Sequence, residues 1–132
     1  MKKTTLLLTA AIALLLYSCN STERKKIERN AYNYAYAMAN YNIDEAEPYA
    51  TPETRNTTLV IARHLVQAVD SSYIISDTPA KIKILDIEIY NDTQAYAVYR
   101  KTTPIKDFYD TLYLRKRDGD WYAHVLSPVP NS

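Results

Sequence analysis

Residues 81–89 have the sequence KIKILDIEI, and here the spacing of the apolar residues changes from a helical period to a period of two. Apolar residues occupy every second position up to Ile84 and again from Ile87 to Ile89, but the two sets differ in phase. A period of two is typical of a β-strand with one buried face, and one extra residue exchanges the two faces. We therefore predict a β-strand that contains a β-bulge at Leu85.

Further strands are predicted downstream, over residues 93–101, 108–117 and 120–126. Asn91-Asp92 is a candidate turn before the first of these strands, and it leaves two registers open. A two-residue loop would turn Tyr96 and Val98 toward the core. With a three-residue loop, the residues turned inward would be Ala95, Ala97 and Tyr99.

The last two strands are joined by Asp118-Gly119, a dipeptide that strongly favours a two-residue hairpin turn. Such a turn pairs Arg117 with Asp120 and places Trp121 on the core face of the sheet.

The residues before the sheet show a helical period. Between residues 23 and 41, apolar residues recur every three or four positions, which predicts an amphipathic helix. A short second helix is predicted over residues 42–50, with Asn42 as its N-cap. The sequence TPE at 51–53 predicts a third helix that ends near Ser71, because Thr can cap a helix and Pro fits its first position.

Helices followed by bulged antiparallel strands indicate an α+β fold, with the helices packed on a curved four-stranded sheet. The sequences AYAMANYNIDEA at 35–46 and YATPET at 49–54 resemble the helical half of the nuclear transport factor 2 (NTF2)-like superfamily. LYLRKRDGDW at 112–121 resembles the hairpin that ends the sheet in these proteins. The resemblance covers residues 27–127 and implies a cystatin-like cone that can enclose a pocket. It implies no catalytic residue, and residues 128–132 would form a C-terminal tail.

The N-terminal sequence predicts where in the cell the protein is located. Two lysines precede an almost entirely apolar run at 6–17. As a helix this run would span about 18 Å, which is too short for a hydrocarbon core of about 30 Å, so it is typical of a secretory signal peptide. The sequence LYSC at 16–19 resembles a bacterial lipobox. The resemblance implies that residues 1–18 are a signal peptide and that Cys19 carries the lipid.

Lipidation at Cys19 predicts a lipoprotein of the bacterial cell envelope, anchored by its acyl chains to a membrane, with the outer membrane favoured. Residues 19–26 would form a polar and basic tether ahead of the domain. The chain resembles small Bacteroidota lipoproteins of unknown function that carry an NTF2-like domain. The face of the membrane on which the domain lies stays open.

The composition excludes several classes of function. A single glycine excludes phosphate-binding loops and dinucleotide-binding turns, which need several glycines. A single cysteine excludes a disulfide framework and thiolate metal centres. A net charge of +1 excludes a strongly basic nucleic-acid-binding protein. His64 and His124 are too far apart in sequence for a local zinc motif, so we expect no metal site. No serine-centred nucleophile motif is visible either, and we expect no cofactor and no catalytic residue.

The 13 tyrosines are the most unusual feature of the composition. Tyrosine combines an apolar ring with a polar hydroxyl group, which suits both a partly solvated core and a binding surface. The tyrosines could therefore fill the core or form a binding surface, and both interpretations stay open. On the second interpretation, the candidate binding residues lie on the sheet face opposite Trp121 and are Tyr109, Tyr113, Tyr122 and His124.

We expect this face to bind a partner protein, a small apolar ligand or a second copy of the chain, and no nucleic acid. The leading hypothesis is a non-catalytic binding module on a membrane-anchored envelope protein. One alternative is a structural subunit of an envelope assembly. The other is an isomerase- or hydratase-like enzyme in which a pocket acid or His124 acts as the base.

Overall fold

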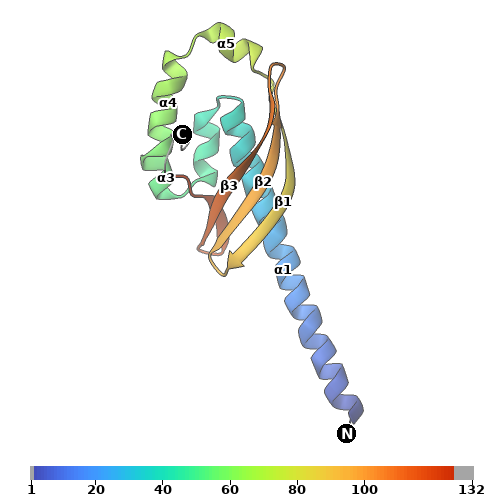
Figure 1. Ribbon diagram of the computed structural model, residues 1–132. Helices are drawn as coiled ribbons and strands as arrows, with labels where there is room; N and C mark the ends of the chain where they lie inside the picture. The colour runs from blue at the N-terminus through green and yellow to red at the C-terminus, as the bar shows by residue number, and fades with distance from the viewer. Residues whose placement is uncertain (1, 127–132) are drawn as a thin grey trace.

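The computed structural model describes the backbone of residues 2–126 and the side chains of residues 20–126. One long helix, α1 (Lys2–Ala39), lies against a four-stranded sheet, and its N-terminal part extends well beyond the sheet (Figure 1). Shorter helical segments follow: α2 (Ile43–Ala46), the 3-10 helix η1 (Glu47–Tyr49), α3 (Pro52–Asn56), α4 (Thr58–Ala68) and α5 (Ser71–Ser76). The strands are β1 (Lys81–Asn91), β2 (Gln94–Thr102), β3 (Asp107–Arg117) and β4 (Asp120–Ala123).

The sheet is antiparallel with the order β1-β2-β3-β4, which confirms the predicted α+β fold. Ile84 and Asp86 pair with consecutive residues of β2, so Leu85 between them has no partner. The predicted β-bulge at Leu85 is therefore confirmed. Beyond the bulge the alternation resumes with the opposite phase, and Ile87 is buried.

The first hairpin combines features of the two open registers. Its loop has two residues, because Asn91 pairs with Gln94, but a second register shift lies between Ile89 and Asn91. Tyr90 is the extra residue at this shift, and one extra residue exchanges the faces of a strand. The inward residues are consequently those expected from the longer loop, namely Ala95, Ala97 and Tyr99.

The last hairpin turns at Asp118-Gly119 as predicted. Both residues have positive φ, 52° and 82°, which is the backbone conformation that a two-residue hairpin loop requires. Arg117 pairs with Asp120 across the turn. Strand β4 is shorter than predicted and ends at Ala123.

The helix predicted over 51–71 is divided into α3 and α4, with α5 as a separate turn beyond them. The predicted cap is confirmed, because the side-chain oxygen of Thr51 accepts a hydrogen bond from the N–H of Thr54. The division falls at Thr57, whose backbone is not helical and whose hydroxyl donates to the carbonyl of Glu53 at 2.7 Å. Threonine hydroxyls compete with the regular helical hydrogen bonds in this way.

The helix predicted over 42–50 is also shorter than expected. Helix α2 ends at Ala46, and η1 follows with Pro48 in its first turn. Proline has no N–H to continue the helical pattern, which explains the change to a 3-10 turn. Asn42 precedes α2, but its side chain makes no capping hydrogen bond.

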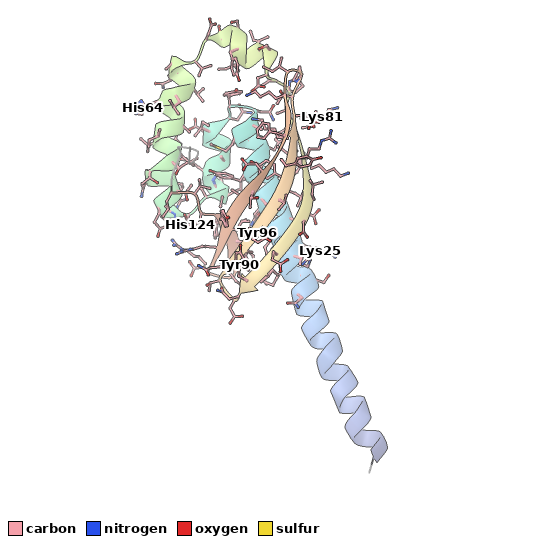
Figure 2. All side chains as sticks on the ribbon, viewed as in Figure 1. Lys25, His64, Lys81, Tyr90, Tyr96 and His124 are labelled. Atoms are coloured by element: carbon pink, nitrogen blue, oxygen red, sulfur yellow. The ribbon has the colours of Figure 1, made fainter. Side chains whose placement is uncertain are left out.

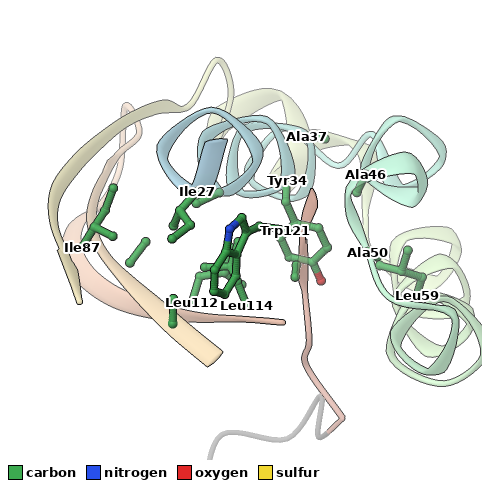
Figure 3. Close-up of a cluster of buried hydrophobic side chains, with 14 of the residues drawn as sticks. Ile27, Tyr34, Ala37, Ala46, Ala50, Leu59, Ile87, Leu112, Leu114 and Trp121 are labelled. Atoms are coloured by element: carbon green, nitrogen blue, oxygen red, sulfur yellow. The ribbon is translucent and has the colours of Figure 1, made fainter. Parts of the chain in front are cut away.

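The core lies between α1 and the inner face of the sheet (Figure 3). Trp121 is 1% exposed and lies among Ile27 and Tyr34 of α1 and Leu114 of β3. Leu59 of α4 belongs to the same cluster. Side chains therefore fill the inner face of the sheet around Trp121.

Residues 20–26 are part of α1, whereas the sequence predicted a tether over 19–26. The carboxylate of Glu23 accepts a hydrogen bond from Nε1 of Trp121 at 2.6 Å. The ammonium of Lys26 donates to the carbonyl of Gly119 at 3.1 Å. A buried indole N–H needs an acceptor, and Glu23 supplies it, so contacts with the sheet begin before residue 27.

Two further predictions concern atoms outside the described part of the chain: the side chain of Cys19 and the C-terminal tail at 128–132. Within the described part, none of the helices combines the length and the apolar character that a membrane span requires.

Candidate binding site on the outer face of the sheet

Three tyrosines form a row across the outer face of the sheet, opposite Trp121. Tyr96 of β2 pairs with Tyr113 of β3, and Tyr90 extends the row from the second bulge of β1. The ring centroids of Tyr90 and Tyr96 lie 5.1 Å apart, and those of Tyr96 and Tyr113 lie 6.3 Å apart. Such separations are typical of interacting aromatic pairs, so these residues form a continuous aromatic surface, which we call the tyrosine row. Figure 2 labels two of its members, Tyr90 and Tyr96.

A pocket of about 440 Å³ opens beside the tyrosine row. Its volume and its combination of apolar walls with a few polar groups are typical of sites for small molecules. The side chains of Tyr113 and Leu126 are 55% and 56% exposed, so their apolar surface is accessible to a ligand. The lining residues are Tyr90, Gln94, Ala95, Tyr113, Leu114, Arg115, His124 and Leu126.

The structure brings together Tyr113 and His124, two of the four predicted site residues. The N–H of His124 donates to the carbonyl of Tyr113 at 2.8 Å, so the pairing of the last hairpin continues beyond β4. The other two do not line this pocket. Tyr109 pairs with Arg100, farther along β3, and Tyr122 pairs with Arg115 beside the pocket.

Two members of the tyrosine row, Tyr90 and Tyr96, were not among the predicted site residues. The side to which Tyr96 points depends on the register of the first hairpin, which the sequence left open. The position of Tyr90 on the outer face could have been predicted, because it lies two residues after Glu88 in the alternating pattern whose outward residues include Asp86 and Glu88.

Threonine side chains at the start of α3 hold His124 in place. Its Nδ1 atom lies 2.9 Å from Oγ1 of Thr51, which in turn lies 2.8 Å from Oγ1 of Thr54. The Thr54 oxygen accepts the N–H of Val125 at 2.9 Å, and the Thr51 oxygen accepts the N–H of Thr54. Each hydroxyl hydrogen is used once if Thr54 donates to Thr51 and Thr51 donates to His124. This assignment makes Nδ1 an acceptor and leaves the ring proton on Nε2.

The electrostatic environment agrees with a neutral imidazole. Burial lowers the pKa of His124, the guanidinium of Arg115 lowers it further, and Glu53 partly opposes them. A histidine with a lowered pKa is uncharged near neutral pH, which matches its role as hydrogen-bond acceptor from Thr51.

The basic residues at the end of β3 differ in their partners. Lys116 pairs with Glu23 at 3.0 Å, and Arg117 pairs with Glu53 at 2.6 Å. The guanidinium of Arg117 lowers the pKa of Glu53 to about 2. Within the described part of the chain, Arg115 has neither an ion-pair partner nor a side-chain hydrogen bond. Arg115 is also the one charged residue among those that line the pocket.

A second polar cluster surrounds Asp77, which is fully buried. Its carboxylate accepts hydrogen bonds from Oη of Tyr41 at 2.7 Å and from the hydroxyl of Thr103 at 2.8 Å, and Lys106 lies 3.6 Å away. Burial alone would raise the pKa of Asp77, but these partners bring it below its ordinary value. Both carboxylate oxygens therefore have partners within the protein, and the cluster joins the end of α1 to the loop after β2.

No group of three or more His, Cys, Asp or Glu side chains is placed to share a metal ion among residues 20–126. His64 lies exposed on α4, away from the pocket (Figure 2).

Comparisons with known proteins bear on the fold. No family model matches the chain, and no curated protein matches it. Among solved structures, a Campylobacter jejuni protein provisionally described as an NTF2-like transpeptidase matches with a TM-score of 0.55 and 14% sequence identity. The match covers 72% of this chain and 94% of that chain. It confirms the NTF2-like fold and, at this level of identity, shows the fold alone.

Proposed function

We propose that this chain is a lipid-anchored protein of the bacterial cell envelope, and that its NTF2-like domain binds a small apolar ligand without catalysing a reaction. The leader sequence and the LYSC motif at 16–19 support the anchor. After cleavage before Cys19, the remaining part of α1 would begin only four residues ahead of Glu23, whose carboxylate contacts Trp121, so the lipidated end would lie close to the folded domain. Figure 1 shows α1 lying against the sheet.

The observation that carries the binding role is the pocket beside the tyrosine row. Trp121 and its neighbours fill the inner face of the sheet, so the aromatic surface that the sheet itself offers to a ligand lies on its outer face. Tyr90 and Tyr113 supply aromatic walls, and Leu126 adds an aliphatic one. Rigid aromatic surface with few polar groups favours ligands that are largely apolar.

Two features favour binding over catalysis. No carboxylate lines the pocket, so a histidine base would act without a paired acid. Nδ1 of His124 is already engaged by Thr51, which fixes the ring structurally. The transpeptidase description belongs to the Campylobacter protein, and we assign no residue of this chain to that reaction.

The binding role can be tested by purifying the full chain from bacterial membranes and extracting whatever small molecule it retains. We expect an extractable apolar molecule with the wild-type protein, and its loss with Tyr113→Ser. Tyr109→Ser is the matched control, because Tyr109 lies on the same face of the same strand but does not line the pocket. Equal retention by the wild type and both variants would contradict the proposal, as would the absence of any retained molecule.

A role as structural subunit of an envelope assembly is the second candidate, and one observation favours it. Helix α4 exposes an uncharged apolar stripe in which Val60, Ile61 and Leu65 are 41%, 41% and 57% exposed. Exposed apolar surface of this kind is typical of protein contacts. In the same purification, a stoichiometric protein partner that is lost with Leu65→Ser and kept with Tyr113→Ser would support this candidate.

A further inference from the structure

We propose that the ligand of the outer-face pocket carries a carboxylate that pairs with Arg115, on an aromatic or aliphatic body that lies against Tyr90, Tyr113 and Leu126. This inference rests on the proposed binding function and names the chemical class of the ligand.

The charge of the pocket is the first argument. Arg115 is the one charged lining residue, so a bound anion would meet one cation and no carboxylate. Glu88 is on the same face and pairs with Tyr96, but it does not line the pocket. An anionic ligand is thus electrostatically favoured here, whereas a cationic ligand would face an unbalanced guanidinium.

The availability of Arg115 is the second argument. Its neighbours Lys116 and Arg117 are each held by a glutamate from a helix, at 3.0 Å and 2.6 Å. Arg115 has no such partner within the described part of the chain, although its planar fork is suited to a carboxylate. A ligand carboxylate would supply the missing partner without breaking an existing ion pair.

The neutral donors of the pocket are the third argument. In the assignment that uses each threonine hydroxyl hydrogen once, Nδ1 of His124 accepts from Thr51, and the proton on Nε2 is left to donate to a ligand. The hydroxyl groups of Tyr90 and Tyr113 make no hydrogen bond within the described residues, so they can donate as well. One guanidinium and several neutral donors beside apolar rings match a molecule with an acidic head and an apolar body.

The body of the ligand is limited by the size and shape of the pocket. A volume of about 440 Å³ accommodates a single ring with a short chain. The tyrosine row offers flat ring surface on which an aromatic body can stack. A simple probe with these features is 3-phenylpropanoate, and its neutral analogue of equal shape is 3-phenylpropanamide.

The inference can be tested by equilibrium dialysis of the full chain reconstituted in zwitterionic nanodiscs, with empty nanodiscs as the blank. We expect 3-phenylpropanoate to bind the wild type at least tenfold more tightly than 3-phenylpropanamide, and Arg115→Gln to abolish this preference. Arg24→Gln is the matched control, because it makes the same change at an exposed arginine on α1, outside the pocket.

The outcomes separate this inference from the proposed function. Equal binding of the two probes, or an unchanged preference in Arg115→Gln, would overturn the carboxylate assignment and leave the pocket as an apolar site. Failure of both probes to bind would overturn the assigned ligand class, while extraction of a neutral apolar molecule would still support the proposed function. A preference for 3-phenylpropanoate that is lost in Arg115→Gln and kept in Arg24→Gln supports the inference.

Discussion

Nδ1 of His124 lies 2.9 Å from Oγ1 of Thr51, and this contact joins the end of the sheet to the start of α3. The two residues are 73 positions apart in sequence. Further contacts strengthen the junction, since the N–H of Thr51 donates to the carbonyl of Ala123 at 2.9 Å and the hydroxyl of Thr58 donates to the carbonyl of Val125. The helices that follow α1 therefore hold one wall of the candidate pocket.

This junction predicts a loss of stability in mild acid. The pKa of His124 is lowered in the folded state, mainly by burial, so the unfolded chain binds more protons as the pH falls through about 6.5. The free energy of unfolding should therefore be lower at pH 5.5 than at pH 7.5. Urea titrations of the full chain at the two pH values would measure this difference.

The matched variant for that prediction is His124→Asn, which keeps an acceptor for the hydroxyl of Thr51 but cannot take up a proton. We expect its unfolding free energy to change less between pH 7.5 and pH 5.5 than that of the wild type. The carboxylates with lowered pKa, such as Glu53, titrate below this window. An identical pH dependence in the two proteins would show that His124 remains uncoupled from folding.

The hydrogen bond between Trp121 and Glu23 predicts that the first described turns of α1 stabilise the domain. Glu23→Ala leaves the indole N–H without its charged acceptor, which should lower the free energy of unfolding by about 1–3 kcal/mol. Glu23→Gln keeps an acceptor and should cost less. Denaturant unfolding followed by the fluorescence of the single tryptophan would measure both.

Glu28→Ala is a suitable control for this prediction, because Glu28 is an exposed acidic residue on the same helix. If Glu23→Ala were as stable as Glu28→Ala, residues 20–26 would behave as the tether that the sequence suggested, and the contact with Trp121 would contribute nothing measurable.

The buried carboxylate of Asp77 predicts a larger effect. Asp77→Ala removes the acceptor for Tyr41 and Thr103 and leaves Lys106 without its buried partner, which should cost about 3 kcal/mol of unfolding free energy. Asp77→Asn keeps one acceptor oxygen and should be intermediate. Chemical denaturation would rank the variants, with the exposed Asp92→Asn as the control. A cost below 1 kcal/mol for Asp77→Ala would contradict a structural role for the cluster.

The proposed lipid anchor predicts that Cys19→Ser is not acylated. Metabolic labelling with radioactive palmitate in a bacterial host should label the wild-type chain and the nearby control Ser21→Ala, but not Cys19→Ser. We also expect Cys19→Ser to move from the membrane fraction to the soluble fraction, because the acyl chains supply most of the membrane affinity. Equal palmitate labelling of Cys19→Ser would rule out this residue as the attachment point.

Local patterns in the sequence determined the first β-bulge and the last hairpin of this protein. The change of phase at Leu85 located a β-bulge, because apolar residues on both sides of it must face the core, and only an extra residue between them allows this. Asp118-Gly119 determined the last hairpin and its register, since few dipeptides adopt the required backbone conformation. Together these signals placed Trp121 in the core and Tyr113 and His124 on the opposite face.

Only the tertiary structure decided which residues share the pocket. The sequence allowed either face of the sheet for Tyr96. The bulge at Tyr90 shifts the register of the first hairpin, so that Tyr96 lies on the outer face and its ring contacts that of Tyr90. Thr51 meets His124 because α3 packs against the end of β4, a contact that no local pattern specifies. Periodicity and turn chemistry act over a few residues and so can be read along the chain. The convergence of distant segments depends on how their surfaces pack, and that is settled only when the whole domain folds.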